Sequence, residues 1–249
     1  MRLGLIGAGN MATALARGWG DPVLVHDPYR PRADALVAEL GGEVVDSNAE
    51  LAERADVLLL AHKPAGLERV AREVGVGAKG VISILGGVTL ASLRGAYGGT
   101  PVVRMIPSVP VEVKQGVTCH ARDGEADRAL EAYAVELFKR VGLVVDLDEA
   151  QFEIATGLMS CAPAYVALVA EAQVDAGVRA GMPADVAGEL VAASIGGSAA
   201  LLQARGMDTL AVRRMVTSPG GITARGLAAL EHGGVRAAFD DAMQAVVAR

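Results

Sequence analysis

Short apolar runs alternate with stretches of helical period along the first part of the chain, up to about residue 146. The runs are rich in β-branched and aliphatic residues, and they predict strands at residues 3–6, 23–26, 57–61, 81–85, 102–106, 116–120 and 143–145. Amphipathic helices are predicted between them, near residues 10–19, 31–40, 48–54, 66–74, 89–95 and 124–141. This alternation is typical of the α/β class, so the sequence predicts a parallel, doubly wound sheet.

The pattern changes after about residue 148, where strand-like runs end and Ala-rich helical stretches begin. These stretches predict helices near residues 149–158, 163–180, 184–205, 208–216 and 223–248. Residues 181–183 and 218–221 contain Gly and Pro and separate neighbouring helices. The second part of the chain is therefore predicted to be all-helical.

Composition narrows the classes of partner. Apolar residues make up 52% of the 249 positions and charged residues 21%, which supports a packed core rather than a disordered chain. The formal net charge of −6 argues against nucleic acid or an anionic membrane as the main partner, since both are bound through basic patches. We find no uninterrupted apolar run of membrane-spanning length and no leader pattern, so we expect a soluble, cytoplasmic protein.

Cysteine usage and helix composition bear on compartment and assembly. Cys119 and Cys161 are far apart and lack metal-ligand spacing, so we expect two reduced thiols and no metal site. The helical part is rich in Ala, Gly and Val, and its apolar surface exceeds what one chain is expected to cover. This predicts a homodimer, with a compact monomeric helix bundle as the alternative.

The first strand-to-helix turn carries a Gly-x-Gly-x-x-Ala pattern made by Gly7, Gly9 and Ala12. Gly7 permits a tight turn, Gly9 lets a pyrophosphate approach the backbone, and Ala12 lets the helix pack closely on the strand. The free N–H groups at the helix N-terminus favour phosphate, although a chance glycine turn is the alternative. The residues predicted here to bind a dinucleotide are Gly7, Ala8, Gly9, Asn10 and Met11.

Asp27 ends the second predicted strand, about 20 residues after Gly7. An acidic residue at this place binds the adenosine ribose hydroxyls and selects NAD over NADP. Arg30 and Arg32 follow closely and can instead hold a 2′-phosphate. Because a carboxylate repels a phosphate, the sequence favours NADH over NADPH; a helix N-cap role for Asp27 is the alternative.

His62, Lys63 and Pro64 follow the strand predicted at residues 57–61. They lie at the carboxyl edge of the predicted sheet, where ligands bind in open α/β folds. We expect these three residues to contribute to the cofactor site, with Lys63 near the nicotinamide ribose. A surface lysine on a proline turn is the alternative.

With these residues placed, the chain resembles the pyrroline-5-carboxylate reductase family over nearly its whole length. The resemblance rests on the segments 6–12, 63–64, 87–89, 163–165, 175–178 and 217–223, of which the last is the most specific. It implies a Rossmann NAD(P)-binding domain over residues 1–147 and an all-helical dimerisation and substrate domain over residues 148–249. It also implies active sites formed between subunits and NAD(P)H-dependent reduction of 1-pyrroline-5-carboxylate to L-proline.

The segment 217–223 offers groups suited to that reaction. The backbone N–H groups of Gly220, Gly221 and Ile222, next to Ser218, can bind the substrate carboxylate at the start of the last predicted helix. Thr223 would place its hydroxyl by the ring nitrogen, where it orients the imine more than it donates a proton. The alternative is a helix-joining turn with Thr223 as its cap.

Two places depart from the family pattern. Ser108 and Val109 stand where the family commonly has Asn-Thr between two prolines, and Met159 and Cys161 stand where it commonly has two serines. Lost polar contacts in a buried site cost on the order of 1–3 kcal/mol each. These changes keep a divergent imine reductase open as an alternative.

Two other functions compete. A β-hydroxyacid dehydrogenase shares the domain order but relies on a lysine in the first long helix of its second domain, and no lysine occurs between Gly157 and Gly181. A nucleotide-binding regulatory protein without turnover would suit the glycine loop together with the altered substrate region. Oxidation of the cofactor on addition of a cyclic imine would separate this last alternative from a reductase.

Overall fold

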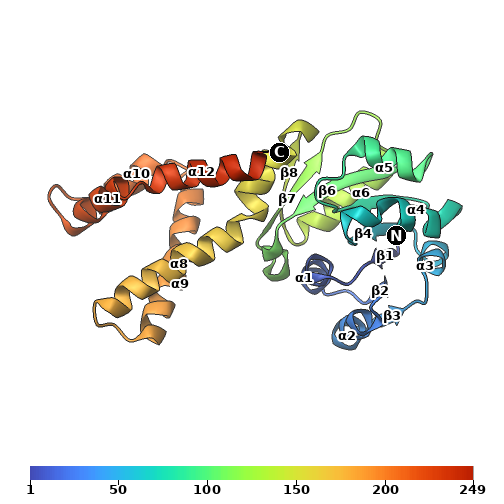
Figure 1. Cartoon of the computed structure of the whole chain (residues 1–249), viewed down its shortest axis with the longest axis horizontal. Coiled ribbons are helices and arrows are strands. Elements are labelled where there is room, and N and C mark those ends of the chain that lie inside the picture. Colours follow the sequence, from blue (N-terminus) through green and yellow to red (C-terminus); the bar gives the residue numbers. More distant parts are fainter. Residues whose placement is uncertain (249) are drawn as a thin grey trace. The chain divides into compact units, whose positions relative to one another are not determined.

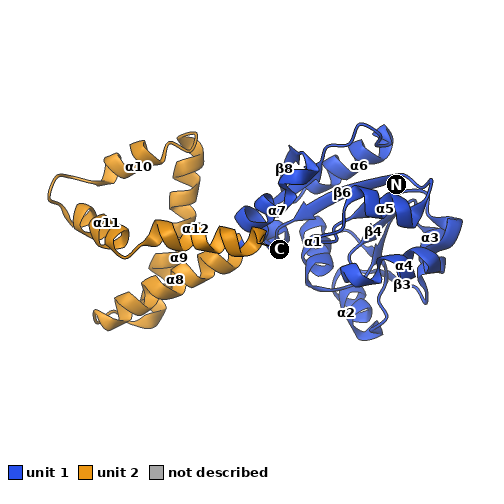
Figure 2. Cartoon of the chain, turned by 45° about the horizontal axis from the view of Figure 1, so that its top comes forward, with its two compact units in different colours: residues 1–161 blue, residues 162–249 orange. Residues whose placement is uncertain are grey.

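The computed structural model describes residues 1–248, which form two compact units, residues 1–161 and residues 162–248 (Figure 2). Each unit is described by itself below. The last strand, β8 (Gly142–Leu147), ends at the boundary that the sequence analysis expects between the domains. The short helical turns that follow it, over residues 149–161, pack with the first unit.

The first unit is built on one eight-stranded sheet in the order β3-β2-β1-β4-β5-β6-β7-β8 (Figure 1). Its remaining strands are β1 (Leu3–Ile6), β2 (Val23–His26), β3 (Gly42–Val44), β4 (Val57–Leu60), β5 (Val81–Ser83), β6 (Val102–Pro107) and β7 (Gly116–Ala121). All neighbouring strands are parallel except β6 and β7. The connection between β6 and β7 is a short 3-10 helix, Val109–Val113, which is too short for a parallel crossover. The predicted α/β class is confirmed, with one antiparallel pair that the pattern did not indicate.

Helices cover both faces of this sheet. They are α1 (Asn10–Trp19), α2 (Arg30–Leu40), α3 (Asn48–Arg54), α4 (Leu67–Val74), α5 (Leu90–Tyr97), α6 (Arg128–Lys139) and the short α7 (Phe152–Ala155). One core packs the side chains of α1, α2 and α6 against Leu5 and Leu59, and the other packs those of α3, α4 and α5 against Ile6 and Leu60. Because successive strand residues point to opposite faces, both cores are filled from the same apolar strands.

One strand, β3, was not predicted from the sequence. β3 is three residues long, lies at the edge of the sheet beside β2, and has no buried residue. A short edge strand whose one apolar residue, Val44, is only partly buried carries no apolar run, so its sequence is not distinguishable from a loop. Ser47 caps the following helix α3: its hydroxyl accepts from Glu50 N at 3.1 Å, and the Glu50 side chain accepts from Asp46 N.

The second unit is helical throughout its regular elements. These are α8 (Ala162–Arg179), α9 (Ala184–Ala204), α10 (Thr209–Val216), α11 (Ile222–His232) and α12 (Val235–Val247). The single helix predicted over residues 223–248 is wrong, because the chain breaks it at Gly233 and Gly234. Gly234 has a φ of 78°, a left-handed conformation that ends one helix before the next begins.

Little of the second unit is covered by its own chain. Among its described residues only Ala187 is fully buried, while Leu168 and Leu190 are 65% and 52% exposed.

The sequence analysis expected no apolar run of membrane-spanning length. The helical stretches 149–179 and 184–204 are, however, long and apolar enough to cross a membrane, judged by length and composition only. Both stretches carry acidic residues, among them Glu171 and Glu189. Apolar helix faces of this extent are also what the predicted homo-oligomer would bury.

Candidate functional site

The turn between β1 and α1 has the geometry of a phosphate-binding loop. Gly7 has a φ of 102°, and a Cβ there would lie 2.9 Å from the carbonyl oxygen of Ala61, so glycine is required for both conformation and space. A Cβ on Gly9 would meet no atom within 4 Å, which leaves open space above this backbone. Helix α1 begins at Asn10 without a side-chain cap, so its first N–H groups remain available to an anion.

This loop forms one wall of a cavity of about 820 Å³ at the carboxyl edge of the sheet. Of the predicted cofactor residues, the cavity is lined by Gly7, Gly9, Asn10, Met11, Asp27, His62, Lys63 and Pro64. Ala8 is a buried residue of the loop and does not line the cavity. Arg30 does not line it either, whereas Arg32 does. The structure thus brings together residues that are spread from position 7 to position 64.

Asp27 joins this loop to the end of β2. One carboxylate oxygen accepts a hydrogen bond from Ala8 N at 2.7 Å, and the other accepts from Tyr29 N at 2.8 Å. The side chain is buried yet lines the cavity, and each oxygen retains a second lone pair for a ribose hydroxyl. Helix α2 begins at Arg30 with Tyr29 as its N-cap, so Asp27 is not the cap of that helix.

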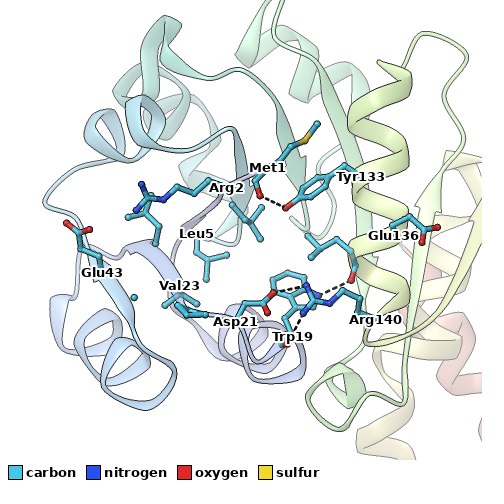
Figure 3. Close-up of a pocket in the computed structure, with 15 residues that line it drawn as sticks. Met1, Arg2, Leu5, Trp19, Asp21, Val23, Glu43, Tyr133, Glu136 and Arg140 are labelled. Atoms are coloured by element: carbon cyan, nitrogen blue, oxygen red, sulfur yellow. Dashed lines mark hydrogen bonds and ion pairs between the residues drawn. The ribbon is translucent and has the colours of Figure 1, made fainter.

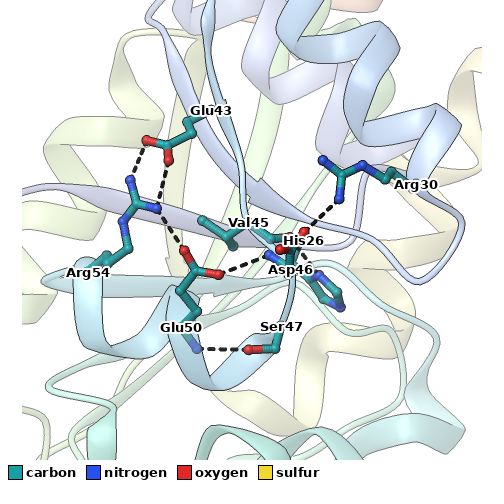
Figure 4. Close-up of polar contacts among 8 residues, drawn as sticks. All are labelled: His26, Arg30, Glu43, Val45, Asp46, Ser47, Glu50 and Arg54. Carbon is teal, nitrogen blue, oxygen red and sulfur yellow. Dashed lines mark hydrogen bonds and ion pairs between the residues drawn. The ribbon is translucent and has the colours of Figure 1, made fainter.

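The two arginines considered for a 2′-phosphate are placed differently. Arg30 contacts Asp46 at 2.6 Å (Figure 4). It also lies 3.6 Å from Asp34, and all three side chains are more than half exposed. The guanidinium of Arg32 lies 5.5 Å from the centre of the Tyr29 ring and faces the cavity. Only Arg32 is therefore positioned at the cavity wall.

His62 lines the same cavity and has an unpaired ring nitrogen. Its Nδ1 lies 2.8 Å from the carbonyl oxygen of Lys63, so Nδ1 carries the proton in this contact and Nε2 has a free lone pair. Nε2 is buried and has no hydrogen-bond partner within the described protein. Burial lowers the pKa of His62, which keeps the ring neutral near pH 7. The exposed Lys63 precedes the short 3-10 helix Pro64–Gly66.

Asn48 is a cavity residue that the sequence analysis missed. It is 5% exposed and donates from Nδ2 to Glu73 at 2.6 Å, while its Oδ1 is buried without a partner among the described residues. A buried unsatisfied oxygen at a cavity wall is suited to a ligand donor. Asn48 follows the recognised N-cap Ser47, but an asparagine in a first helical turn carries no pattern that marks it as a ligand residue.

The predicted substrate segment forms a tight turn followed by α11 in the second unit. Gly221 N donates to the carbonyl oxygen of Ser218 at 3.0 Å, and Gly220 has a φ of 69°. A Cβ on Gly221 would lie 2.3 Å from the Ser218 hydroxyl, so a side chain here would force that hydroxyl to rotate away. No side chain caps α11, and Ile222 and Thr223 are exposed at its start. Their N–H groups precede the first intrahelical bond, from Arg225 to Gly221.

The residues that depart from the family pattern all lie in the first unit. The Ser108 hydroxyl is buried and accepts from Val117 N at 2.9 Å, so it secures the connection between β6 and β7. Val109 is 45% exposed. Met159 is buried in a π-helical turn, Thr156–Ser160, and Cys161 at its end is half-buried. Ser108 is therefore satisfied within the fold in the absence of any ligand contact.

A second cavity, of about 660 Å³, lies at the opposite edge of the sheet (Figure 3). Its floor includes Leu5, Val23 and Trp19, and at its rim Asp21 pairs with Arg140 at 2.7 Å. It lies beside the amino ends of β1 and β2. Dinucleotides bind at the carboxyl ends in doubly wound sheets, so this cavity is not the predicted cofactor site.

Two family models match the chain, one in each of the two parts that the sequence pattern distinguishes. The model described as "Pyrroline-5-carboxylate reductase dimerisation" matches residues 149–249. The model described as "NADP oxidoreductase coenzyme F420-dependent" matches residues 2–87, which include the glycine loop and the turn at Lys63. The glycine loop and the segment from Ser218 to Thr223 thus fall in two separately matched regions.

Full-length relatives and solved structures agree with these matches. The chain is 36% identical to a pyrroline-5-carboxylate reductase of Synechocystis and 37% identical to one of Thermus thermophilus, covering 100% of this chain and 97% of each relative. Among structures, the reductase of Plasmodium falciparum with NADP bound gives a TM-score of 0.88 at 27% identity, over 99% of this chain and 95% of that one. The Coxiella burnetii enzyme gives 0.87 at 29%, over 99% and 96%. The chain belongs to the pyrroline-5-carboxylate reductase family.

Proposed function

We propose that the protein reduces 1-pyrroline-5-carboxylate to L-proline with a reduced nicotinamide dinucleotide. The observation that carries this proposal is the intact turn Ser218–Thr223 ahead of an uncapped helix, together with a glycine-loop cavity at the carboxyl edge of the sheet. Relatives bearing this reductase name match the chain from end to end. The family models that match support the same pairing of a nucleotide region with a dimerisation region.

The residues of the cavity fit a nicotinamide dinucleotide. Open space above Gly9 and the free N–H groups of α1 suit a pyrophosphate. The unpartnered Oδ1 of Asn48 and Nε2 of His62 are acceptors that suit ribose hydroxyl or carboxamide donors. When bound, the reduced nicotinamide supplies the hydride that converts the imine carbon to an amine carbon.

The turn at the start of α11 would hold and orient the substrate. The backbone N–H groups near Gly220, Gly221 and Ile222 bind the carboxylate, helped by the positive end of the helix dipole. The Thr223 hydroxyl orients the ring nitrogen and relays a proton from water, because a threonine hydroxyl is too weak an acid to donate on its own near pH 7. Holding the two reacting carbons in line can lower the barrier by several kcal/mol, on the order of what good positioning supplies.

For the cofactor, we propose a preference for NADH over NADPH. Asp27 places a carboxylate at the cavity wall where the adenosine ribose is expected, and Arg30 is occupied by two carboxylates. Both features disfavour a 2′-phosphate. Arg32, which faces the cavity, is the group that supports the opposite preference.

We further propose that residues 148–249 act as the dimerisation and substrate domain of a cytoplasmic homodimer or larger homo-oligomer, with active sites completed between subunits. The exposed apolar faces of α8 and α9 support burial against a second copy. Two free cysteines and a net charge of −6 support a reducing compartment and no nucleic-acid partner.

A second function, reduction of a related cyclic imine, is favoured by the substitutions at Val109, Met159 and Cys161. These replace polar groups of the family pattern by apolar or weakly polar ones. A catalytically weak nucleotide-binding regulatory protein is the remaining alternative. Steady-state rates with cyclic imines that carry or lack the carboxylate would separate these functions.

The deciding experiment follows the absorbance of NADH and NADPH with 1-pyrroline-5-carboxylate and the purified protein. We expect oxidation that depends on the imine and falls about 10²-fold in Thr223→Ala, the range of a lost positioning or proton-relay contact. Thr223→Ser keeps the hydroxyl and is the matched control. Normal cofactor binding without any oxidation would contradict the proposed reaction.

A further inference from the structure

Two segments form the expected adenosine end of the cofactor cavity. The turn after β2 contributes Asp27, the first turn of α2 contributes Arg32, and the first residue of α3 contributes Asn48. The ion pair between Arg30 and Asp46 joins these segments, since Arg30 starts α2 and Asp46 lies two residues before Asn48. The pair lies beside the cavity without lining it (Figure 4).

Arg30 is held by carboxylates on two sides. Its Nη1 donates to Asp46 Oδ1 at 2.6 Å, and its Nε lies 3.6 Å from Asp34 Oδ1. The hydrogen bond to Asp46, followed by the charges of Asp34 and Asp46, raises the pKa of Arg30. The donors of the guanidinium that point toward these carboxylates are not available to another anion.

Asp46 is itself fixed in place by its neighbours. Its backbone N–H donates to Glu50 Oε2 at 3.0 Å, and Glu50 Oε1 accepts from Arg54 at 2.9 Å. Arg54 in turn pairs with Glu43 of the edge strand β3. These contacts fix the backbone at Asp46, whose carboxylate is exposed and bonded to Arg30 (Figure 4).

Groups of both signs surround this end of the cavity, whose charged lining residues are Asp27, Arg32, Lys63 and Arg69. Asp27, Asp34 and Asp46 oppose Arg30 and Arg32, and the neighbouring Arg54 is outnumbered by Glu43 and Glu50. A ribose 2′-phosphate carries up to two negative charges and needs a free guanidinium. A ribose with free hydroxyls needs only acceptors, which Asp27 and Asn48 provide.

We propose that Asp46 is a positioning residue that sets the preference for NADH, because it holds Arg30 away from a 2′-phosphate. The inference rests on the proposed nicotinamide-dependent function, but it concerns binding and is testable without turnover. Removing the Asp46 charge frees Arg30 to swing toward the cavity and makes the potential there more positive. Asp34 acts in the same direction from one turn further along α2.

The test measures dissociation constants of NADH and NADPH by calorimetry for the wild type, Asp46→Asn, Arg30→Met and the double variant. We expect the wild type to bind NADH more tightly than NADPH. Asp46→Asn should strengthen NADPH binding about three- to fivefold, the size of a surface ion-pair effect. The affinity for NADH should change by less than about twofold. The gain should disappear in the double variant, since it requires Arg30.

Asp21→Asn is the matched control. It breaks an exposed ion pair of similar length, with Arg140, at the other end of β2. It should leave the ratio of the two dissociation constants unchanged.

Three results would overturn the proposal: an unchanged ratio in Asp46→Asn, an equal gain for both cofactors, or a gain that persists without Arg30. A wild type that binds NADPH more tightly and loses this on Arg30→Met would also overturn it. Failure of imine reduction with both cofactors still bound would contradict the proposed reaction and leave this binding test intact.

Discussion

The carboxylate of Asp27 accepts a hydrogen bond from the backbone N–H of Ala8 at 2.7 Å, across 19 positions of sequence. This contact ties the glycine loop to the end of β2, so one side chain both shapes that loop and lines the cavity. Replacement of Asp27 should therefore affect folding stability and cofactor affinity together.

We expect Asp27→Ala to lower the free energy of unfolding by about 1–3 kcal/mol, because Ala8 N–H loses its acceptor in a buried place. The dissociation constant of NADH should rise in the same variant. Urea unfolding and calorimetric titration measure the two effects. Asp27→Asn keeps one acceptor oxygen and should lie between the wild type and Asp27→Ala; an unchanged stability in Asp27→Ala would contradict the structural role of the contact.

Substitutions at Gly7 and Gly9 test two different requirements, the backbone conformation of the loop and the access of the ligand. Gly7→Ala should destabilise the fold by about 1–2 kcal/mol, because the residue has a φ of 102° and its Cβ would lie 2.9 Å from a carbonyl oxygen. Gly9→Ala adds a methyl group in open space, so stability should change by less than about 0.5 kcal/mol. Its Cβ would occupy the space expected for the pyrophosphate, and cofactor affinity should fall on the order of tenfold. Thermal unfolding with and without NADH distinguishes these results, and loss of stability in Gly9→Ala would refute this assignment.

Asn48 supplies a third prediction about affinity. Its buried Oδ1 has no partner within the described protein, so we expect a donor of the bound cofactor to satisfy it. Asn48→Ala should raise the dissociation constant of NADH about fivefold to tenfold, the size of one hydrogen bond. Asn48→Ala also removes a donor to Glu73, so Glu73→Gln is the control for that loss. Equal affinity in the wild type and Asn48→Ala would remove Asn48 from the site.

His62 predicts a dependence on pH. Burial lowers its pKa in the folded protein below the usual value of about 6.5, so the unfolded chain takes up a proton first as the pH falls. The stability that comes from the neutral ring is fully present above about pH 6.5 and is lost as the pH falls through the folded pKa. Urea unfolding between about pH 8 and about pH 5 should therefore show a steeper decline for the wild type than for His62→Gln. Parallel curves for the two proteins would contradict this assignment.

Elements with buried residues were predicted from the sequence, because burial requires a regular pattern of apolar residues. β1 and β2 were predicted with their observed bounds, because their apolar residues fill two cores from one strand. β3 was missed because two of its three residues are exposed and the third is only partly buried. The break at Gly233 and Gly234 was missed because the flanking residues keep a helical period.

The candidate site was predicted in part for a similar reason. Gly7 and Gly9 belong to a local pattern, and the structure places them as expected. Asn48 and the pairing of Arg30 with Asp46 depend on which turns meet at the sheet edge. Such contacts join residues through the fold, so the order of residues along the chain gives no sign of them.

The near absence of buried side chains in the second unit has a consequence for how the protein folds. With only Ala187 fully buried among the described residues there, the helices of one chain have too small a core to hold together alone. If a second chain supplies the missing contacts, folding of this unit and association are a single equilibrium, and its melting temperature rises with protein concentration. The helices that flank the turn from Ser218 to Gly221 would then be stable only in the assembly, so dilution alone would lower the activity.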